Sequence, residues 1–119
     1  MKSVLIAEDN ADLREIFAQV FTFHQFNVRV AHDGQAALAF LEAELPDVLV
    51  LDINMPRLSG FDVLDFIRRR TSIKQVKIIV VTGSMLAMQS PEAEYADLFL
   101  VKPVAVHDLI EFATRLTTE

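Results

Sequence analysis

Short runs of apolar residues, rich in β-branched side chains, recur along this chain and alternate with segments of helical periodicity. Each run has the length of a strand that is buried on both faces of a sheet. Parallel neighbouring strands need crossover connections, and a helix after each strand provides one. The alternation therefore predicts an α/β fold in three layers, a doubly wound five-stranded parallel sheet with five helices. The predicted strands are Val4–Ala7, Val28–Ala31, Val48–Leu51, Val76–Val81 and Leu98–Val101.

Helical periodicity fills the segments between these runs. Apolar residues at spacings of three and four form one stripe after the first strand, and similar stripes recur later. The segment 85–96 is the least regular, because Pro91 would break a helix interior, whereas Ser90 before it is suited to cap a new helix. The stripes consist of Leu13, Ile16, Phe17, Val20 and Phe21; Ala37, Phe40 and Leu41; Phe61, Leu64 and Ile67; and Val106, Leu109, Ile110 and Ala113.

Length, charge and the lack of cysteine narrow the possible functions. A chain of 119 residues that is 52% hydrophobic fits one core, so residues 1–119 are predicted to form one domain. The net charge of -6 opposes a polyanion, and the basic run 68–70 fits the dipole at a helix end, so we expect no direct nucleic-acid partner. Without cysteine, neither a disulfide nor a thiolate metal site is available. No apolar run approaches the ~18 residues of a membrane span, so we expect no membrane contact and a cytoplasmic location.

Polar side chains stand at the ends of four predicted strands. Glu8 and Asp9 follow the first strand, Asp52 follows the third, Thr82 the fourth and Lys102 the fifth. The carboxyl ends of parallel strands share one edge, where open α/β sheets place their chemistry. Three carboxylates at one edge repel one another and call for a cation. Because no histidine or cysteine accompanies them, the oxygen ligands favour Mg²⁺.

This set of residues is typical of phosphoryl transfer. A divalent ion held by a few carboxylates keeps positions open for phosphate oxygens, and a carboxylate can act as the nucleophile that forms an aspartyl phosphate. Lys102 and Thr82 would then stabilise charge on the phosphoryl oxygens. Each residue alone has an ordinary explanation, since an acidic pair caps helices and a lysine is commonly solvated. The ordered set at one edge favours a site over these separate explanations.

The ordered set resembles the receiver domain of two-component response regulators along the whole chain. The resemblance implies a flavodoxin-like sheet with strand order 2-1-3-4-5. It also implies a module that accepts a phosphoryl group from a sensor histidine kinase or a histidine phosphotransfer protein and then switches partner binding. The matching residues are Glu8, Asp9, Asp52, Pro56, Gly60, Thr82, Phe99, Lys102 and Pro103.

The resemblance also implies individual roles. Asp52 is the expected phosphoacceptor, and Asp9, Asp52 and the backbone carbonyl of Asn54 are the expected Mg²⁺ contacts, with Glu8 assisting through water. Thr82 and Phe99 are expected to report phosphorylation on the face made by the fourth helix, the fifth strand and the fifth helix, where a downstream protein partner would bind. Three residues have structural roles in this pattern, namely Pro56, Gly60 and Pro103, the last with a cis peptide bond after Lys102.

Four residues depart from the family pattern. Glu8 replaces the commoner aspartate and adds one methylene, and Gly83 replaces a small alanine, which is expected to loosen the loop after Thr82. Tyr95 stands where glycine is frequent, and Pro91 interrupts the fourth helix. These departures concern the shape of the output face more than the chemistry.

The sequence favours a phosphorylation-regulated signalling domain over an enzyme that acts on external substrates. Two alternatives stay open. One is a pseudo-receiver that binds partners without phosphorylation. The other is a phosphohydrolase of the haloacid dehalogenase class, which is disfavoured because Asn54 stands where those enzymes carry a second aspartate as general acid. The chain ends soon after the fifth predicted helix, so both a stand-alone receiver and a fragment of a larger protein are compatible with the sequence.

Overall fold

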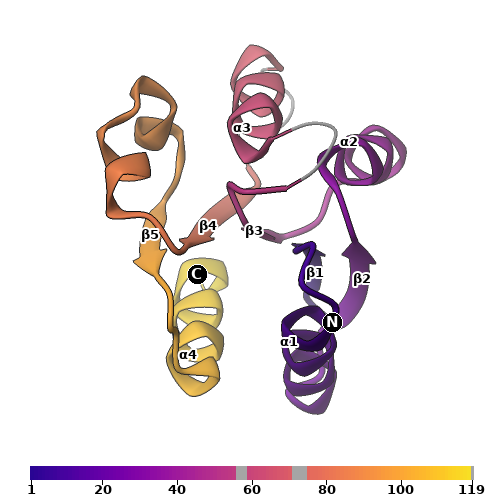
Figure 1. The fold of residues 1–119 in the computed structure, drawn as a ribbon. Coiled ribbons are helices and arrows are strands. Elements are labelled where there is room, and N and C mark those ends of the chain that lie inside the picture. Colours follow the sequence, from indigo (N-terminus) through magenta and orange to yellow (C-terminus); the bar gives the residue numbers. More distant parts are fainter. Residues whose placement is uncertain (56–58, 71–74, 119) are drawn as a thin grey trace.

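The computed structural model describes residues 1–55, 59–70 and 75–118 (Figure 1). Five parallel strands form one sheet in the order β2-β1-β3-β4-β5, which confirms the predicted fold class and strand order. The strands are β1 (Ser3–Ala7), β2 (Asn27–Ala31), β3 (Val48–Leu51), β4 (Lys77–Thr82) and β5 (Leu98–Val101). The helices are α1 (Ala11–Phe23), α2 (Gly34–Ala43), α3 (Gly60–Arg69) and α4 (Val106–Thr117), with two 3₁₀ helices, η2 (Met85–Gln89) and η3 (Pro91–Tyr95).

The sheet separates two apolar cores, one on each face. Successive side chains of a strand point to opposite faces, and in β1 Leu5 and Ala7 join one core, while Val4 and Ile6 join the other. Helices α2 and α3 and the two 3₁₀ helices cover the first face, and α1 and α4 cover the second (Figure 1). Because both faces of the sheet are covered, polar side chains are confined to its edges and strand ends.

The fourth crossover differs from the prediction of a fifth helix. Instead of one α-helix, the described chain forms η2 and η3, which meet at Ser90. Ser90 has an extended backbone, as expected for a residue that precedes proline, and Pro91 lacks the N–H that a continuous helix needs. The predicted helix 4 is therefore wrong in type, and the break at Pro91 that the sequence indicated is its cause.

Two smaller predictions also needed adjustment. Ile16 was placed on the apolar stripe of the first helix, but its side chain is 46% exposed, because α1 buries mainly Phe17 and Phe21. The outer strands β2 and β5 are only partly buried, since each pairs with a single neighbour, and Val30 is 40% exposed.

The arginine run at the end of α3 is used within the molecule. Arg69 forms an ion pair with Asp65 at 3.0 Å, and the guanidinium of Arg68 lies 5.1 Å from the centre of the Tyr95 ring. Arg70 lies over the Phe66 ring in the same way, at 4.5 Å. The contact from Arg68 links α3 to η3, so Tyr95 takes part in holding the fourth crossover against the body of the protein.

Gly60 allows α3 to approach the end of β3. Its backbone N–H donates to the carbonyl of Ile53 at 2.8 Å, and a Cβ at this position would lie only 2.6 Å from the carbonyl oxygen of Asp52 and the Cα of Ile53. We predict that Gly60→Ala lowers the free energy of unfolding by about 1–3 kcal/mol, because the backbone after Asp52 has to move. Urea unfolding monitored by circular dichroism measures the change.

Gly83 provides the matched control. An added Cβ there meets no atom within 4 Å, and the glycine does not have a positive φ. Gly83→Ala is therefore expected to raise the free energy of unfolding by about 0.4–1 kcal/mol, because it restricts the unfolded chain. Equal stabilities of wild type and Gly60→Ala would contradict the close approach of α3 to β3.

Candidate functional site

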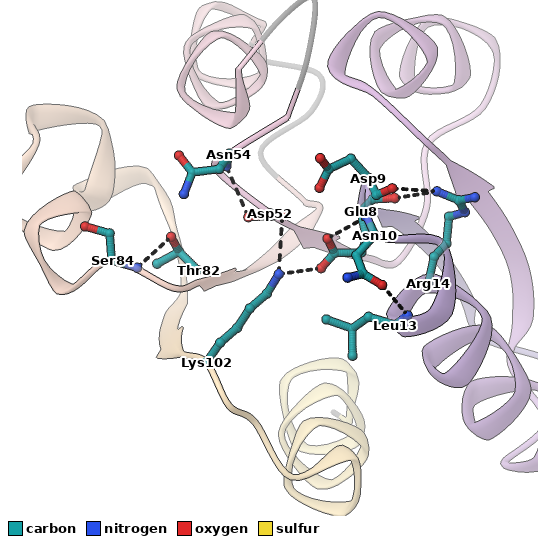
Figure 2. Close-up of polar contacts among 10 residues, drawn as sticks. All are labelled: Glu8, Asp9, Asn10, Leu13, Arg14, Asp52, Asn54, Thr82, Ser84 and Lys102. Atoms are coloured by element: carbon teal, nitrogen blue, oxygen red, sulfur yellow. Dashed lines mark hydrogen bonds and ion pairs between the residues drawn. The ribbon is translucent and has the colours of Figure 1, made fainter.

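The backbone ladder extends one residue beyond three strands and thereby fixes the side chains that follow. The N–H of Glu8 donates to the carbonyl of Ala31 at 3.1 Å, and the N–H of Asp52 donates to that of Ala7 at 2.9 Å. The N–H of Lys102 donates to the carbonyl of Thr82 at 2.7 Å. These side chains therefore meet at the carboxyl edge of the sheet, as the sequence predicted (Figure 2).

An acidic cluster lies at this edge. One carboxylate oxygen from each of Glu8, Asp9 and Asp52 lies within 4.8 Å of the others. Glu8 and Asp52 are only 2% and 3% exposed, whereas Asp9 is exposed at the mouth of the cluster. Because burial removes water that would screen the charges, Glu8 and Asp52 repel each other more strongly than they would on an open surface.

Lys102 partly compensates this charge. Its Nζ lies 2.9 Å from Glu8 Oε1 and 3.4 Å from Asp52 Oδ2, and the peptide bond to Pro103 is cis, as predicted. Burial alone would lower the pKa of Lys102, but the hydrogen bond and charge of Glu8 and the charge of Asp52 outweigh burial and raise it. For Glu8, burial alone would raise the pKa, but hydrogen bonds, first among them that from Lys102, lower it.

Asp52 is the least compensated of the buried acids. Burial, together with the hydrogen bond and negative charge of Glu8, raises the pKa of Asp52 to about 7. Two contacts oppose this shift, since Asp52 Oδ1 accepts the N–H of Asn54 at 3.1 Å and Asp52 Oδ2 faces Lys102. A cation bound beside Asp52 would favour its ionised form, which is the form that attacks an electrophile.

Thr82 and Phe99 belong to β4 and β5, the two strands that follow β3 in the sheet. Thr82 is fully buried, and its Oγ1 accepts the N–H of Ser84 at 3.3 Å. Phe99 is half-buried on β5 and packs against the core on the α2 and α3 face, so it is outside the acidic cluster. Pro56 lies outside the described residues. The structure thus brings Glu8, Asp9, Asp52 and Lys102 together, and it places Thr82 at the end of the neighbouring strand.

Two residues near the cluster were not singled out from the sequence. The side chain of Asn10 caps α1 by accepting the N–H of Leu13 at 2.9 Å, and its own N–H donates to Glu8 Oε2 at 3.2 Å. Arg14 donates to the carbonyl of Glu8 at 2.8 Å. An asparagine just before an apolar helical stripe is a recognisable cap, but the contact of Arg14 depends on how the preceding loop turns.

The donor chemistry fits a hard divalent cation. The cluster offers carboxylate oxygens from three residues, and one lysine offsets only part of their charge. Mg²⁺ is usually bound by one or two carboxylates and keeps several water ligands. An exposed Asp9 beside two buried acids is compatible with such an arrangement.

The chain belongs to the response regulator receiver domain family. The family model matches residues 4–114. The chain is 31% identical over 107 residues to response regulator MprA of Mycobacterium avium (strain 104), a match that covers 90% of this chain and 47% of that protein. The MprA of Mycobacterium tuberculosis (strain H37Rv) is also 31% identical, with 90% and 46% covered. The chain therefore spans about half the length of the curated relatives it matches.

Solved structures agree with this family. Response regulator TrrA of Thermotoga maritima, in complex with Mg²⁺-BeF, has a TM-score of 0.88 and 28% identity, with 98% of this chain and 99% of that chain covered. Chemotaxis protein CheY4 of Vibrio cholerae has a TM-score of 0.87 and 29% identity, with 98% of each chain covered. The receiver domain of Francisella response regulator 1452 has a TM-score of 0.88 and 26% identity, covering 98% and 97%. In the described part of this chain, no helix has the length and hydropathy needed to cross a membrane.

The shifted pKa of Asp52 predicts a pH-dependent stability in the absence of divalent cations. The folded protein holds the Asp52 proton up to about pH 7, whereas the carboxyl has an ordinary pKa of 3.8, so wild-type stability falls as pH rises between these values. Asp52→Asn removes this loss. Its free energy of unfolding should exceed that of wild type by roughly 1–3 kcal/mol at pH 8 and by little at pH 4.

Urea unfolding in EDTA across this pH range measures the difference. Asp12→Asn, at an exposed residue in the first turn of α1, is the matched control, because it removes a carboxylate outside the cluster. Parallel pH profiles for wild type and Asp52→Asn would show that burial of Asp52 has no energetic consequence.

Proposed function

We propose that this chain is a phosphorylation-regulated signalling module of two-component systems, with Asp52 as the phosphoacceptor. The observation that supports this role most directly is the buried Asp52 carboxylate, which lies within 4.8 Å of the Glu8 and Asp9 oxygens and 3.4 Å from Lys102 Nζ. Membership of the receiver domain family supports the same role. The phosphoryl donor is the phosphohistidine of a sensor kinase or of a histidine phosphotransfer protein, and the whole of residues 1–119 acts as one cytoplasmic receiver domain.

The acidic cluster holds Mg²⁺ in this proposal. Asp9 and Asp52 would supply carboxylate oxygens, Glu8 would assist through water, and the backbone carbonyl of Asn54 would supply another ligand from the loop after β3. When bound, Mg²⁺ neutralises the clustered carboxylates and the incoming phosphoryl oxygens. The presence of Mg²⁺ with BeF in the related TrrA structure supports this assignment.

The transfer needs few protein groups. A carboxylate oxygen of Asp52 attacks the phosphorus atom, the new O–P bond forms as the P–N bond to the donor imidazole breaks, and the imidazole leaves with the electron pair. Lys102 stabilises negative charge on the phosphoryl oxygens, and the Thr82 hydroxyl donates a hydrogen bond to one of them. Thr82 ends β4, the strand next to β3, which Asp52 follows. Lys102 follows β5, one strand farther along the sheet.

The output of the module is binding rather than turnover of external substrates. Asn54 cannot transfer a proton, and Lys102 stays protonated because the neighbouring acids raise its pKa. The partner face consists of η2, η3, β5 and α4, in place of the helix 4, strand 5 and helix 5 expected from the sequence. Met85 and Leu86 on this face are 69% and 74% exposed, which favours contact with a protein partner.

Phosphoryl uptake is the direct test. Incubation with acetyl phosphate and Mg²⁺ should add one phosphoryl group, ~80 Da, to the intact mass. Asp52→Asn and wild type in EDTA should both show no addition, because the first lacks the acceptor and the second lacks the cation. Intact mass spectrometry reads all three samples. Folded wild-type protein that binds Mg²⁺ and yet gains no mass would favour the pseudo-receiver alternative.

The switch through Thr82 and Phe99 has a separate test. The phosphoryl group should draw the Thr82 hydroxyl toward Asp52, and Phe99 should then repack. We expect the Phe99 ring signals in NMR spectra to shift on addition of beryllium fluoride with Mg²⁺ in wild type and in Thr82→Ser, which keeps the hydroxyl. Thr82→Ala should bind the same ligand with little shift of Phe99. An equal Phe99 shift in Thr82→Ala would break the link between the two residues.

A further inference from the structure

Arg14 reaches back from the start of α1 over the loop that joins β1 to this helix (Figure 2). Its Nη1 donates to the carbonyl of Glu8 at 2.8 Å and, more weakly, to the carbonyl of Asp9 at 3.5 Å. A guanidinium carries several N–H donors in a fixed plane, so it can hold two neighbouring acceptors in one orientation. Arg14 thus contacts the backbone of both acidic residues rather than their carboxylates.

The two carbonyls belong to the point where the chain leaves the sheet. The N–H of Glu8 still donates to the carbonyl of Ala31 at 3.1 Å. The carbonyls after this point no longer pair with a neighbouring strand, so they need other hydrogen-bond donors. Figure 2 shows both carbonyls turned toward Arg14, on the side away from Asp52. With the carbonyls held there, the side chains of this loop are left to face the acidic cluster.

Asp9 depends on this backbone more than Glu8 does. The Glu8 carboxylate is fixed directly, by Lys102 at 2.9 Å and by the N–H of Asn10 at 3.2 Å. The Asp9 carboxylate, within the residues that the structure describes, makes no hydrogen bond or ion pair. Its position near Glu8 and Asp52 therefore follows from the orientation of its own peptide, which Arg14 contacts.

We propose that Arg14 is a positioning residue for the cation site, because its hold on the Glu8 and Asp9 carbonyls orients the Asp9 carboxylate toward Asp52. The inference rests on the proposed function, in which Asp9 is a Mg²⁺ ligand. Groups that orient metal ligands from outside the coordination sphere commonly change metal affinity by 10-fold or more when they are replaced.

Geometry and charge act in opposite directions here, which makes the role of Arg14 testable. The positive charge of Arg14 near the acids disfavours a cation by itself, so removal of that charge should tighten Mg²⁺ binding. Loss of the planar donor group should weaken binding. Arg14→Lys keeps the charge and removes the guanidinium, whereas Arg14→Gln removes both.

The experiment is a calorimetric titration of the full chain with MgCl₂ alone, at a temperature where melting curves in EDTA show every variant folded. The set is wild type, Arg14→Lys, Arg14→Gln, Asp9→Asn and the double variant Asp9→Asn with Arg14→Lys. Arg115→Lys is the matched control, because Arg115 pairs with Glu111 on α4, away from the site, at 2.6 Å. We expect Arg14→Lys to weaken Mg²⁺ binding about 10-fold and the control to leave it unchanged.

The double variant separates positioning from general stability. If Arg14 acts through Asp9, then Arg14→Lys should have less than about a two-fold effect once Asp9 is Asn, because the ligand it orients is already lost. An equal effect in both backgrounds overturns the inference, as does an unchanged affinity of Arg14→Lys with tighter binding by Arg14→Gln. In those cases wild type still binds Mg²⁺ and the proposed function stands. Wild type that binds no Mg²⁺ overturns both.

Discussion

Repulsion among three carboxylates is the constraint around which the site is arranged. Oxygens of Glu8, Asp9 and Asp52 lie within 4.8 Å of one another, and two of these residues are buried, where water screens charge poorly. Lys102 contacts Glu8 and Asp52 and neutralises one unit of charge. Burial and the charge of Glu8 still raise the pKa of Asp52 to about 7. The edge therefore carries negative charge that Lys102 alone does not neutralise. A divalent cation at this edge would neutralise the remaining charge.

The strand order explains why these residues meet although they are far apart in the sequence. In the order β2-β1-β3-β4-β5, the chain winds outward from β1 in one direction and from β3 in the other, so the crossovers diverge between them. Glu8 and Asp52 follow those two central strands, and the helices after them lie on opposite faces of the sheet. The diverging connections leave the edge between β1 and β3 uncovered by a crossover, and the acidic cluster lies there.

The strands and the residues that directly follow them could be predicted from the sequence, because their signals are local. Buried parallel strands are short apolar runs, and Asp52 and Lys102 could be assigned to the sheet edge because each follows such a run directly. The form of the fourth crossover was not predictable, since Pro91 indicates a break but not that 3₁₀ helices replace the helix. Ile16 illustrates a second limit, because helical periodicity shows which residues share a face and not how much of it the neighbouring elements cover. The roles of the site residues stay predictions until the chemistry is measured.

Glu8, at a position where the receiver pattern leads us to expect aspartate, takes a large part in how the site balances its charges. Glu8 Oε1 lies 2.9 Å from Lys102 Nζ, whereas Asp52 Oδ2 is 3.4 Å away. Lys102 therefore lowers the pKa of Glu8, while Asp52 keeps a raised pKa. A cation beside Glu8 would compete with Lys102 for the same carboxylate. In the proposed function, a Lys102 ammonium group held less tightly by Glu8 would be available to phosphoryl oxygens at Asp52, whose Oδ2 lies 3.4 Å away in this structure.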